Sequence, residues 1–417
     1  MKILNLIEGG RLMKYIVVLC DGMADYPVEE LNNKTPLQYA NTPTMDYMAK
    51  HGILGMVKTV PEGMPPGSDT ANMAVFGYDP FVYYSGRSPF EAASMGVNML
   101  DTDITFRCNL VTVSEDEPYE EKIMLDHSAG EITNDEAGEL IKAVSKYLST
   151  DVIKFYQGIS YRHLMIWGNG PYAWNLTPPH DILGKKVKDY MPRGLGSEII
   201  DEMTRKSNEF LSAHDINKKR IARGLNPANS IWIWGEGKRP LLSSFYEKYK
   251  LKGSVISAVD LIKGIGLCAG LDVVDVEGAT GNVDTNYIGK AKAALDEMAK
   301  GNDFVYIHVE APDECGHRYE IENKYKAIEY IDNQIVKVIK DEMERIGEDY
   351  KMIILPDHPT PLALRTHTSE PVPFLIYQSN NEKDNPNGSY DEDTAKETGL
   401  YFSEGYKLMD YFLKGNM

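Results

Sequence analysis

The chain has 417 residues, of which 42% are apolar and 25% charged, as in an ordinary globular protein long enough for two or three domains. Its 62 acidic and 44 basic residues give a net charge of −18. That charge argues against a nucleic-acid-binding surface, because affinity for the phosphate backbone comes from clustered Lys and Arg. No apolar run approaches the ~20 residues that span a bilayer, so we expect no membrane partner either.

The four cysteines are scattered and form no C-x-x-C pair; they are Cys20, Cys108, Cys268 and Cys315. This spacing favours reduced thiols in a cytoplasmic protein over a disulfide framework or a zinc finger. Residues 1–13 contain an apolar stretch too short for a secretory signal. We expect them to form an N-terminal extension ahead of the first strand.

The first core element is the apolar run 15–20, which predicts a buried strand with Asp21 directly after it. Ligands of open α/β sheets bind beyond the carboxyl ends of the strands, so Asp21 is a candidate ligand as well as a candidate turn cap. Pro and Gly then fix a loop up to Gly67, and an Ala-rich helix follows. Ser68 is therefore at or just before a helix N-terminus. There it is either an ordinary N-cap or a nucleophile beside a phosphate bound by the helix N–H groups. Asn72, one turn on, is placed to donate to a phosphate oxygen.

The alternation of strands and helices stops between about residue 108 and residue 250. This predicts an inserted domain of mixed α+β type at 108–250, within a core domain formed by 14–107 and 251–417. Several polar residues of the insert are either substrate contacts or ordinary surface and core groups. They are Asp126, His127, Arg162, His163, His180 and Asp181.

After the insert the chain twice repeats the pattern of a buried strand followed by Asp. The polar residues are Asp313 and His317 after the strand 304–309, and Asp357, His358 and His367 after the strand 352–355. An i, i+4 pair on a helical turn faces one way, so Asp313 and His317 are able to meet one ion.

Together with Asp21 these residues make three Asp and three His, enough for two metal sites with three protein ligands each. Ser68 would be shared or adjacent. Two divalent ions clamp the entering and leaving oxygens of a phosphoryl displacement, and Mn, Zn or Mg suits that role better than calcium. For each strand followed by Asp, the plainer interpretation is that the Asp caps a turn and the His lies on the surface. Three occurrences of the same pattern make that interpretation weaker.

Several motifs between residue 14 and about residue 378 resemble one known family. They are VVLCDGMAD, PPGSDTANMAVFGYDP, YSGRSPFEA, FRCNLVT, DHSAGEIT, PPHD, GATGNVDTNYIGKA, HVEAPDECGH, LPDH and RTHT. By these the chain resembles the archaeal-type cofactor-independent phosphoglycerate mutases of the alkaline phosphatase superfamily. The resemblance implies an alkaline-phosphatase-like α/β fold, in which helices flank a mostly parallel sheet and an inserted smaller α+β domain closes over the substrate.

The resemblance also implies roles for individual residues. One metal would be held by Asp313, His317 and His367, and the other by Asp21, Asp357, His358 and the Ser68 oxygen. Ser68 would become a transient phosphoserine. His127, with Asp126 beside it, resembles a substrate-facing histidine. Weaker carry-overs to the substrate are Arg162, His163, His180 and Asp181.

The implied activity interconverts 3-phosphoglycerate and 2-phosphoglycerate, as in glycolysis and gluconeogenesis, with two divalent metal ions and without 2,3-bisphosphoglycerate. The expected partner is a small phosphorylated metabolite; the oligomeric state stays open. Two alternatives also remain. A bacterial branch of the family, proposed to phosphorylate homoserine in threonine biosynthesis, shares the motifs YRH, PPHDI, PANSIWIWG and EAPDECGH. The other alternative is a metal-dependent phosphomonoesterase of the same fold.

Overall fold

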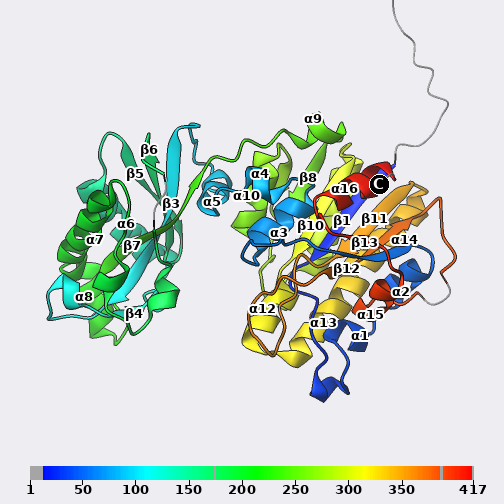
Figure 1. The fold of residues 1–417 in the computed structure, drawn as a ribbon, viewed down its shortest axis with the longest axis horizontal. Helices are drawn as coiled ribbons and strands as arrows, with labels where there is room; N and C mark the ends of the chain where they lie inside the picture. Colours follow the sequence, from blue (N-terminus) through cyan, green and yellow to red (C-terminus); the bar gives the residue numbers. More distant parts are fainter. Residues whose placement is uncertain (1–12, 173–174, 386–387, 416–417) are drawn as a thin grey trace, which may run out of the picture. The chain divides into compact units, whose positions relative to one another are not determined.

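A computed structural model describes residues 13–172, 175–385 and 388–415 (Figure 1). The predicted N-terminal extension therefore lies, apart from Met13, outside the described residues. The chain forms two compact units, here called unit 1 (Met1–Tyr84 with Leu241–Met417) and unit 2 (Ser85–Pro240). None of the helices in the described ranges is long and apolar enough to cross a membrane.

Unit 1 is built on an eight-stranded sheet. Its strands are β1 (Lys14–Cys20), β2 (Ile53–Val57), β8 (Gly253–Ile256), β9 (Asp272–Val274), β10 (Phe304–Val309), β11 (Tyr350–Leu355), β12 (Val372–Gln378) and β13 (Tyr401–Phe402). Their order is β13-β2-β12-β11-β1-β10-β8-β9. Only β12 is antiparallel to its neighbours among these strands, so the mostly parallel sheet predicted from the sequence is confirmed.

Helices cover both faces of this sheet (Figure 1). They are η1 (Glu29–Leu31), α1 (Pro36–Tyr39), α2 (Pro43–Lys50), α3 (Ser68–Val75), α4 (Pro80–Tyr83), α9 (Phe245–Tyr249), α10 (Asp260–Cys268), α11 (Tyr287–Ala299), α12 (Ala311–Arg318), α13 (Ile321–Ile331), η5 (Asp332–Val336), α14 (Lys337–Ile346), α15 (Glu392–Glu397) and α16 (Lys407–Lys414). On one face Ile16 and Val18 of β1 join a hydrophobic core with α2, α11, α13 and α14. On the other, Tyr15 contacts Phe412 of α16, and Tyr306 of β10 stacks on Phe76 at the end of α3. Burial on both faces explains the continuous apolar runs of the central strands.

The long helical stretch after α12 is interrupted by the π-helical segment η5. Asp332, the first residue of η5, is fully buried, and its carboxylate accepts hydrogen bonds from the backbone N–H groups of Thr44 (3.3 Å) and Met45 (2.7 Å). These N–H groups belong to the first turn of α2, where backbone N–H groups have no acceptor within the helix. The π-helical segment η5 therefore places the Asp332 carboxylate against the N-terminus of α2.

Unit 2 contains an antiparallel five-stranded sheet in which β3 is central. Its elements are α5 (Ser88–Ser94), β3 (Asp103–Val113), η2 (Tyr119–Glu121), β4 (Met124–Asp126), α6 (Asn134–Leu148), β5 (Ile153–Ile159), β6 (Arg162–Gly168), η3 (Pro179–Ile182), η4 (Val187–Tyr190), α7 (Ser197–Ser212), α8 (Asp215–Ala222) and β7 (Ser230–Lys238). The sheet order is β4-β3-β6-β5, and β7 also pairs with β3. Apolar residues of α6 and α7 cover one face and form a separate core.

The division between the units differs from the predicted limits of 108 and 250. Residues 85–107 belong to unit 2, because Thr105 of β3 donates to the Gly237 carbonyl of β7 (3.1 Å), while Ser88 of α5 donates to the Thr105 carbonyl (3.1 Å). Residues 241–250 belong to unit 1, where Phe245 of α9 packs on Phe304 of β10 with ring centroids 4.4 Å apart. Within unit 2 the two ends of the segment are joined, since Ser85 Oγ donates to the Lys238 carbonyl (2.6 Å).

Candidate active site

The candidate site of unit 1 lies where β1, β10 and β11 end. These three strands are adjacent and parallel, so their carboxyl ends meet at one edge of the sheet. Asp21 directly follows β1, α12 follows β10 and brings Asp313, and Asp357 with His358 follows β11. The predicted convergence of these residues is therefore found in the structure.

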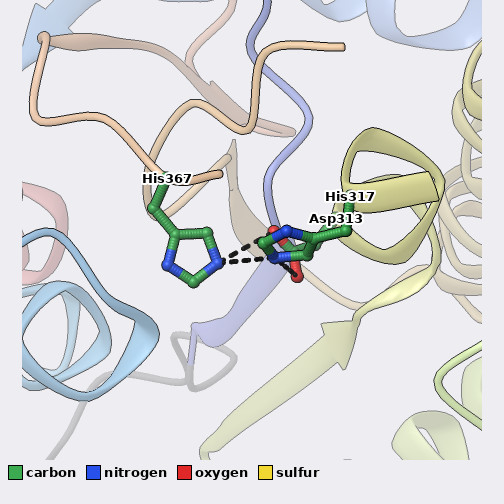
Figure 2. Close-up of side chains that lie close together, drawn as sticks. All are labelled: Asp313, His317 and His367. Carbon is green, nitrogen blue, oxygen red and sulfur yellow. Dashed lines mark hydrogen bonds and ion pairs between the residues drawn. The ribbon is translucent and has the colours of Figure 1, made fainter. Parts of the chain in front are cut away.

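Asp313, His317 and His367 form the first group of candidate metal ligands. Helix α12 carries Asp313 and His317 one turn apart, and His367 approaches from the loop after β11 (Figure 2). His317 Nε2 lies 3.3 Å from Asp313 Oδ2 and 2.9 Å from His367 Nε2, and His367 Nε2 lies 3.4 Å from Asp313 Oδ1. The side chains thus direct two ring nitrogens and a carboxylate at one point.

A hydrogen bond on the outer side of His317 decides which ring nitrogen carries the proton and which one keeps the lone pair. Its Nδ1 lies 2.9 Å from the Arg365 carbonyl oxygen, which only accepts, so Nδ1 carries the proton. In the neutral ring the lone pair is then on Nε2, as metal ligation requires. The hydrogen bond with Asp313 raises the pKa of His317 to about 9. Positive charge is therefore favoured at this position, and a divalent cation would supply it.

Asp21, Asp313 and His358 form the second candidate group, and all three are buried. His358 Nε2 lies 3.7 Å from Asp21 Oδ1. Within the described part of the chain, Oδ1 of Asp21 is buried without a hydrogen-bond partner, whereas a buried oxygen normally has one. Thr360 donates to Asp313 Oδ1 (2.5 Å) and so accepts from His358 Nδ1 (3.3 Å), which leaves the His358 lone pair on Nε2 as well.

The two groups share Asp313, and the electrostatics of the site call for a cation. Burial raises the pKa of Asp21 well above its usual value, and the charges of Asp357, Asp313 and Glu310 raise it further. Burial also opposes ionisation of Asp313, but hydrogen bonds with His317 and His367 hold its pKa well below the usual value. Carboxylates gathered in a buried site repel one another unless a cation lies between them. The donor set of carboxylates and imidazoles fits Zn or Mn.

Asp357 is the one predicted Asp or His ligand that lies outside both groups. Its Oδ1 accepts the backbone N–H of Gly22 (3.1 Å) and of His358 (2.9 Å), and its Oδ2 accepts Asn72 Nδ2 (2.8 Å). Oδ2 nevertheless lies 3.4 Å from His358 Nε2, so Asp357 stays at the site. Sequence reasoning did not foresee that its hydrogen bonds fix both oxygens.

Ser68 is the first residue of α3, and Gly67 rather than Ser68 occupies the N-cap position. The Ser68 hydroxyl lies 3.1 Å from His358 Nε2, beside the second group of ligands. Asn72, one turn further on, is held by Tyr306 of β10, which donates to Asn72 Oδ1 (2.7 Å). Asn72 Nδ2 donates to the Ser68 carbonyl (2.9 Å) and to Asp357, so the predicted donation to a phosphate would replace an internal hydrogen bond.

In unit 2 the structure brings together only part of the predicted set. The rings of His127 and His180 have centroids 6.1 Å apart, and His180 lies 5.5 Å from the Trp234 ring. Arg162 is exposed, with its guanidinium 5.5 Å from the Tyr161 ring centroid. Asp181 is exposed beside His180, 3.7 Å from its Nε2.

Two other predicted residues of unit 2 have structural contacts. Asp126 accepts hydrogen bonds from the backbone N–H groups of Ser128 (2.8 Å) and Gly130 (2.6 Å), and so shapes the turn after β4. His163 is 3% exposed within β6, and its Nδ1 accepts the Gly158 N–H (3.1 Å). Burial lowers the pKa of His163 to about 3, so the ring is neutral.

Sequence reasoning missed a cluster of arginines in the same unit. Arg107 of β3 stacks on Trp234 of β7, 4.3 Å from the ring centroid, and its Nε lies 3.1 Å from Glu91 of α5. Arg87 also pairs with Glu91 (3.0 Å). Although partial burial opposes the ionisation of Glu91, the charges of Arg107, Arg87 and Arg162 lower its pKa, so three cations act on one carboxylate. The available signal was Arg107 within the motif FRCNLVT.

Comparisons with known proteins give the same family repeatedly. A sequence profile described as 2,3-bisphosphoglycerate-independent phosphoglycerate mutase matches residues 49–217. A relative from Geobacter sulfurreducens, named a probable 2,3-bisphosphoglycerate-independent phosphoglycerate mutase, is 50% identical over 401 residues, which cover 96% of this chain and 100% of the relative. A 2,3-bisphosphoglycerate-independent phosphoglycerate mutase from Methanosarcina mazei is 49% identical over 403 residues, again 96% of this chain and 100% of the relative.

Solved structures agree over nearly the whole chain. A protein from Pyrococcus horikoshii has a TM-score of 0.80 at 31% identity, covering 97% of both chains. A cofactor-independent phosphoglycerate mutase from Thermoplasma acidophilum has a TM-score of 0.64 at 27% identity, covering 96% of this chain and 99% of the other.

Proposed function

The chain belongs to the family of 2,3-bisphosphoglycerate-independent phosphoglycerate mutases, and from that premise we propose that Ser68 carries the phosphoryl group between the two positions of its substrate. The enzyme is an isomerase that interconverts 3-phosphoglycerate and 2-phosphoglycerate. The observation that carries the proposal is the Ser68 hydroxyl 3.1 Å from His358 Nε2, at the start of a helix and next to a group of buried ligands.

The transfer balances without an outside phosphoryl donor. The Ser68 oxygen attacks the phosphorus of 3-phosphoglycerate, the bond from phosphorus to the C3 oxygen breaks, and the serine proton ends on that oxygen. The bound glycerate then presents its C2 hydroxyl to the phosphoserine. A bond forms from phosphorus to the C2 oxygen, the bond to Ser68 breaks, and the serine hydroxyl is restored. The backbone N–H groups of Ser68 and Asp69 at the start of α3 would hold the transferring phosphoryl oxygens, whereas that of Thr70 donates to Asp69 Oδ1 (2.8 Å).

Two divalent cations, Mn, Zn or Mg, are proposed for the two groups of ligands. Asp313, His317 and His367 would hold one; the other would be held by Asp21, His358 and the Ser68 oxygen, with Asp357 beside them. Bound cations lower the pKa of a hydroxyl and neutralise charge on the transferring phosphoryl group. Support comes from the orphaned Oδ1 of Asp21 and from the inward-facing lone pairs of the histidines.

Recognition of the glycerate part is proposed for unit 2. Arg107 and Arg162 carry the charge that a carboxylate needs, and His127 and His180 add hydrogen-bonding groups. We retain Asp181 as a neighbour of His180, whereas the contacts of Asp126 and His163 support a structural role. Unit 2 would also exclude water, because a phosphoserine exposed to water would be hydrolysed. All four cysteines are unpaired, which supports a reducing cytoplasmic location.

The test is to trap the intermediate. Manganese-loaded enzyme is mixed with 3-phosphoglycerate, quenched in acid and digested, and the peptides are examined by mass spectrometry. One phosphoryl group is expected on the peptide that contains Ser68, and none is expected from Ser68→Ala. A phosphorylated peptide elsewhere, or full mutase turnover by Ser68→Ala, would exclude Ser68 as the carrier.

A further inference from the structure

His308 is a fully buried histidine of β10 that belongs to neither group of candidate ligands. Val305 and Ile307 of the same strand point into the hydrophobic core, so Tyr306 and His308 share the opposite face. A buried imidazole among apolar neighbours lowers stability unless both ring nitrogens have partners. Both nitrogens of His308 do, and one partner is Asp21.

The contacts of His308 assign its ring proton. Nε2 lies 2.8 Å from Asp21 Oδ2; a carboxylate that binds a cation is ionised and only accepts, so Nε2 is the donor when the metal centre is filled. Nδ1 lies 3.1 Å from Ser257 Oγ and therefore accepts from that hydroxyl. Ser257 Oγ in turn accepts the backbone N–H of Val259 (2.9 Å), just ahead of α10. The backbone carbonyl of His308 accepts from Lys290 Nζ (2.6 Å), which fixes the strand at the same residue.

This chain of hydrogen bonds ends at one oxygen of Asp21. Oδ2 is occupied by His308, whereas Oδ1 has no hydrogen-bond partner in the described ranges and lies 3.7 Å from His358 Nε2. We propose that His308 is a positioning residue of the metal centre: its Nε2–H fixes the Asp21 carboxylate so that Oδ1 alone is presented to the cation. This inference rests on the metal centre of the proposed function.

The physical effect follows from the geometry of a carboxylate. A free carboxylate rotates and binds through either oxygen or both, so ordering it costs entropy when the metal arrives. A donor that fixes one oxygen removes that cost in advance and keeps the other oxygen in place. Substitution of such outer partners typically weakens metal binding roughly 10- to 100-fold. We expect a loss in this range at the site of Asp21 and none at the site of His317 and His367.

Two matched variants separate the donor from the volume of the ring. In His308→Gln the amide nitrogen is as many bonds from the backbone as Nε2, so the donor to Asp21 is retained. In His308→Asn the amide reaches only as far as Nδ1, so contact with Ser257 is retained and the donor is lost. Binding of Mn²⁺ is measured by chelator competition, and bound Co²⁺ reports the coordination of each site by its visible spectrum.

Wild type should bind two Mn²⁺ ions; if it binds none, the proposed metal centre itself is wrong. Given two ions in wild type, His308→Asn should weaken one of them roughly 10- to 100-fold and alter one Co²⁺ band. His308→Gln should stay within a few-fold of wild type. Unchanged affinities in His308→Asn, or an equal loss in both variants, would overturn the positioning role.

Melting of the metal-free proteins in EDTA controls for damage to the fold. Should His308→Asn fail to fold, Ser257→Ala provides the second arm, because it leaves the ring in place and removes only its outer partner. A several-fold loss of Mn²⁺ affinity at one site is then expected. Wild-type affinity at both sites in Ser257→Ala would contradict the inference.

Discussion

The Nε2 atoms of His317 and His367 face each other across 2.9 Å, although Nδ1 of His317 is already committed to the Arg365 carbonyl. Two inward lone pairs at this distance repel unless a proton or a cation lies between them. A cation held by both rings and by Asp313 resolves the conflict without charging either imidazole.

Substitution His367→Ala should therefore remove one bound ion and leave the other. The loss in Mn²⁺ affinity at that site should exceed the roughly 10- to 100-fold effect of outer-shell changes, because a direct ligand is lost. Titration followed by metal analysis gives the stoichiometry. His51→Ala is the matched control, since His51 lies beside Glu382, away from the ligands, and both ions should remain. Two ions of wild-type affinity in His367→Ala would show that His367 is not a ligand.

Replacement of Ser68 should separate chemistry from stability. Gly67 is the N-cap of α3, so Ser68→Ala should leave the free energy of unfolding of the metal-free protein near wild type while abolishing turnover. Ser244 provides the contrast, because it caps α9 and its Oγ accepts the Glu247 N–H (3.1 Å). Ser244→Ala should cost ~1 kcal/mol in urea unfolding and keep its turnover. The opposite pattern would make Ser68 a structural serine.

Glu392 should make the stability of unit 1 depend on pH. Burial raises the pKa of Glu392 to about 7, from an ordinary value of 4.5 in the unfolded chain. The protonated form is thus favoured by folding. The protonated Glu392 therefore adds its full contribution to the free energy of unfolding below pH 4.5, and this contribution is lost as the pH rises to 7. Wild type should therefore lose stability relative to Glu392→Gln across this window, by at most ~3 kcal/mol.

Urea unfolding in EDTA between pH 4.5 and 8 measures this difference. Glu397→Gln is the matched control, because Glu397 is exposed at the end of the same helix α15. For that variant the difference from wild type should be constant with pH. A flat difference for Glu392→Gln as well would mean that the Glu392 carboxyl is ionised in the folded protein throughout.

The ion pair of Lys324 and Asp25 should stabilise the loop that carries His367. Both side chains are buried; Lys324 Nζ lies 2.7 Å from Asp25 Oδ2 and donates to the Thr360 carbonyl (2.8 Å). Lys324→Met leaves a buried carboxylate unpaired and should cost ~3–5 kcal/mol. Combining it with Asp25→Asn should recover part of that loss. Lys326→Met, on the exposed side of α13, should unfold like wild type. Equal free energies of unfolding for wild type and all these variants would show that the ion pair does not stabilise the protein.

The strand ends were the predictable part of the site. A run such as 304–309 is buried on both faces whatever its neighbours are, so its apolar pattern marks a central strand, and polar residues just beyond it belong to the ligand edge. Asp21, Asp313 and His358 were found in this way. Contacts across the sheet were not predictable, because His308 lies on β10 and Asp21 directly follows the neighbouring strand β1, and nothing in either segment encodes their register.

The limits of unit 2 were misplaced for a similar reason. The segment 85–107 contains a helix and half a strand that fit either unit by their pattern. Their assignment depends on partners far along the chain, such as the Gly237 carbonyl of β7, which accepts a hydrogen bond from Thr105. Likewise a serine at a helix start is an N-cap or the first helical residue according to the preceding backbone. The sequence does not distinguish these possibilities when that preceding residue is a glycine such as Gly67.

The hydrogen bond between Ser85 and Lys238 joins the two ends of unit 2, while every candidate ligand and Ser68 come from the rest of the chain. A continuous segment whose ends adjoin is a module that a genome can exchange by one insertion or deletion event. Descendants of one ancestral gene are thereby free to acquire new acceptors for the phosphoryl group while inheriting the same chemistry. Chimaeras that swap residues 85–240 between relatives would trace that history directly.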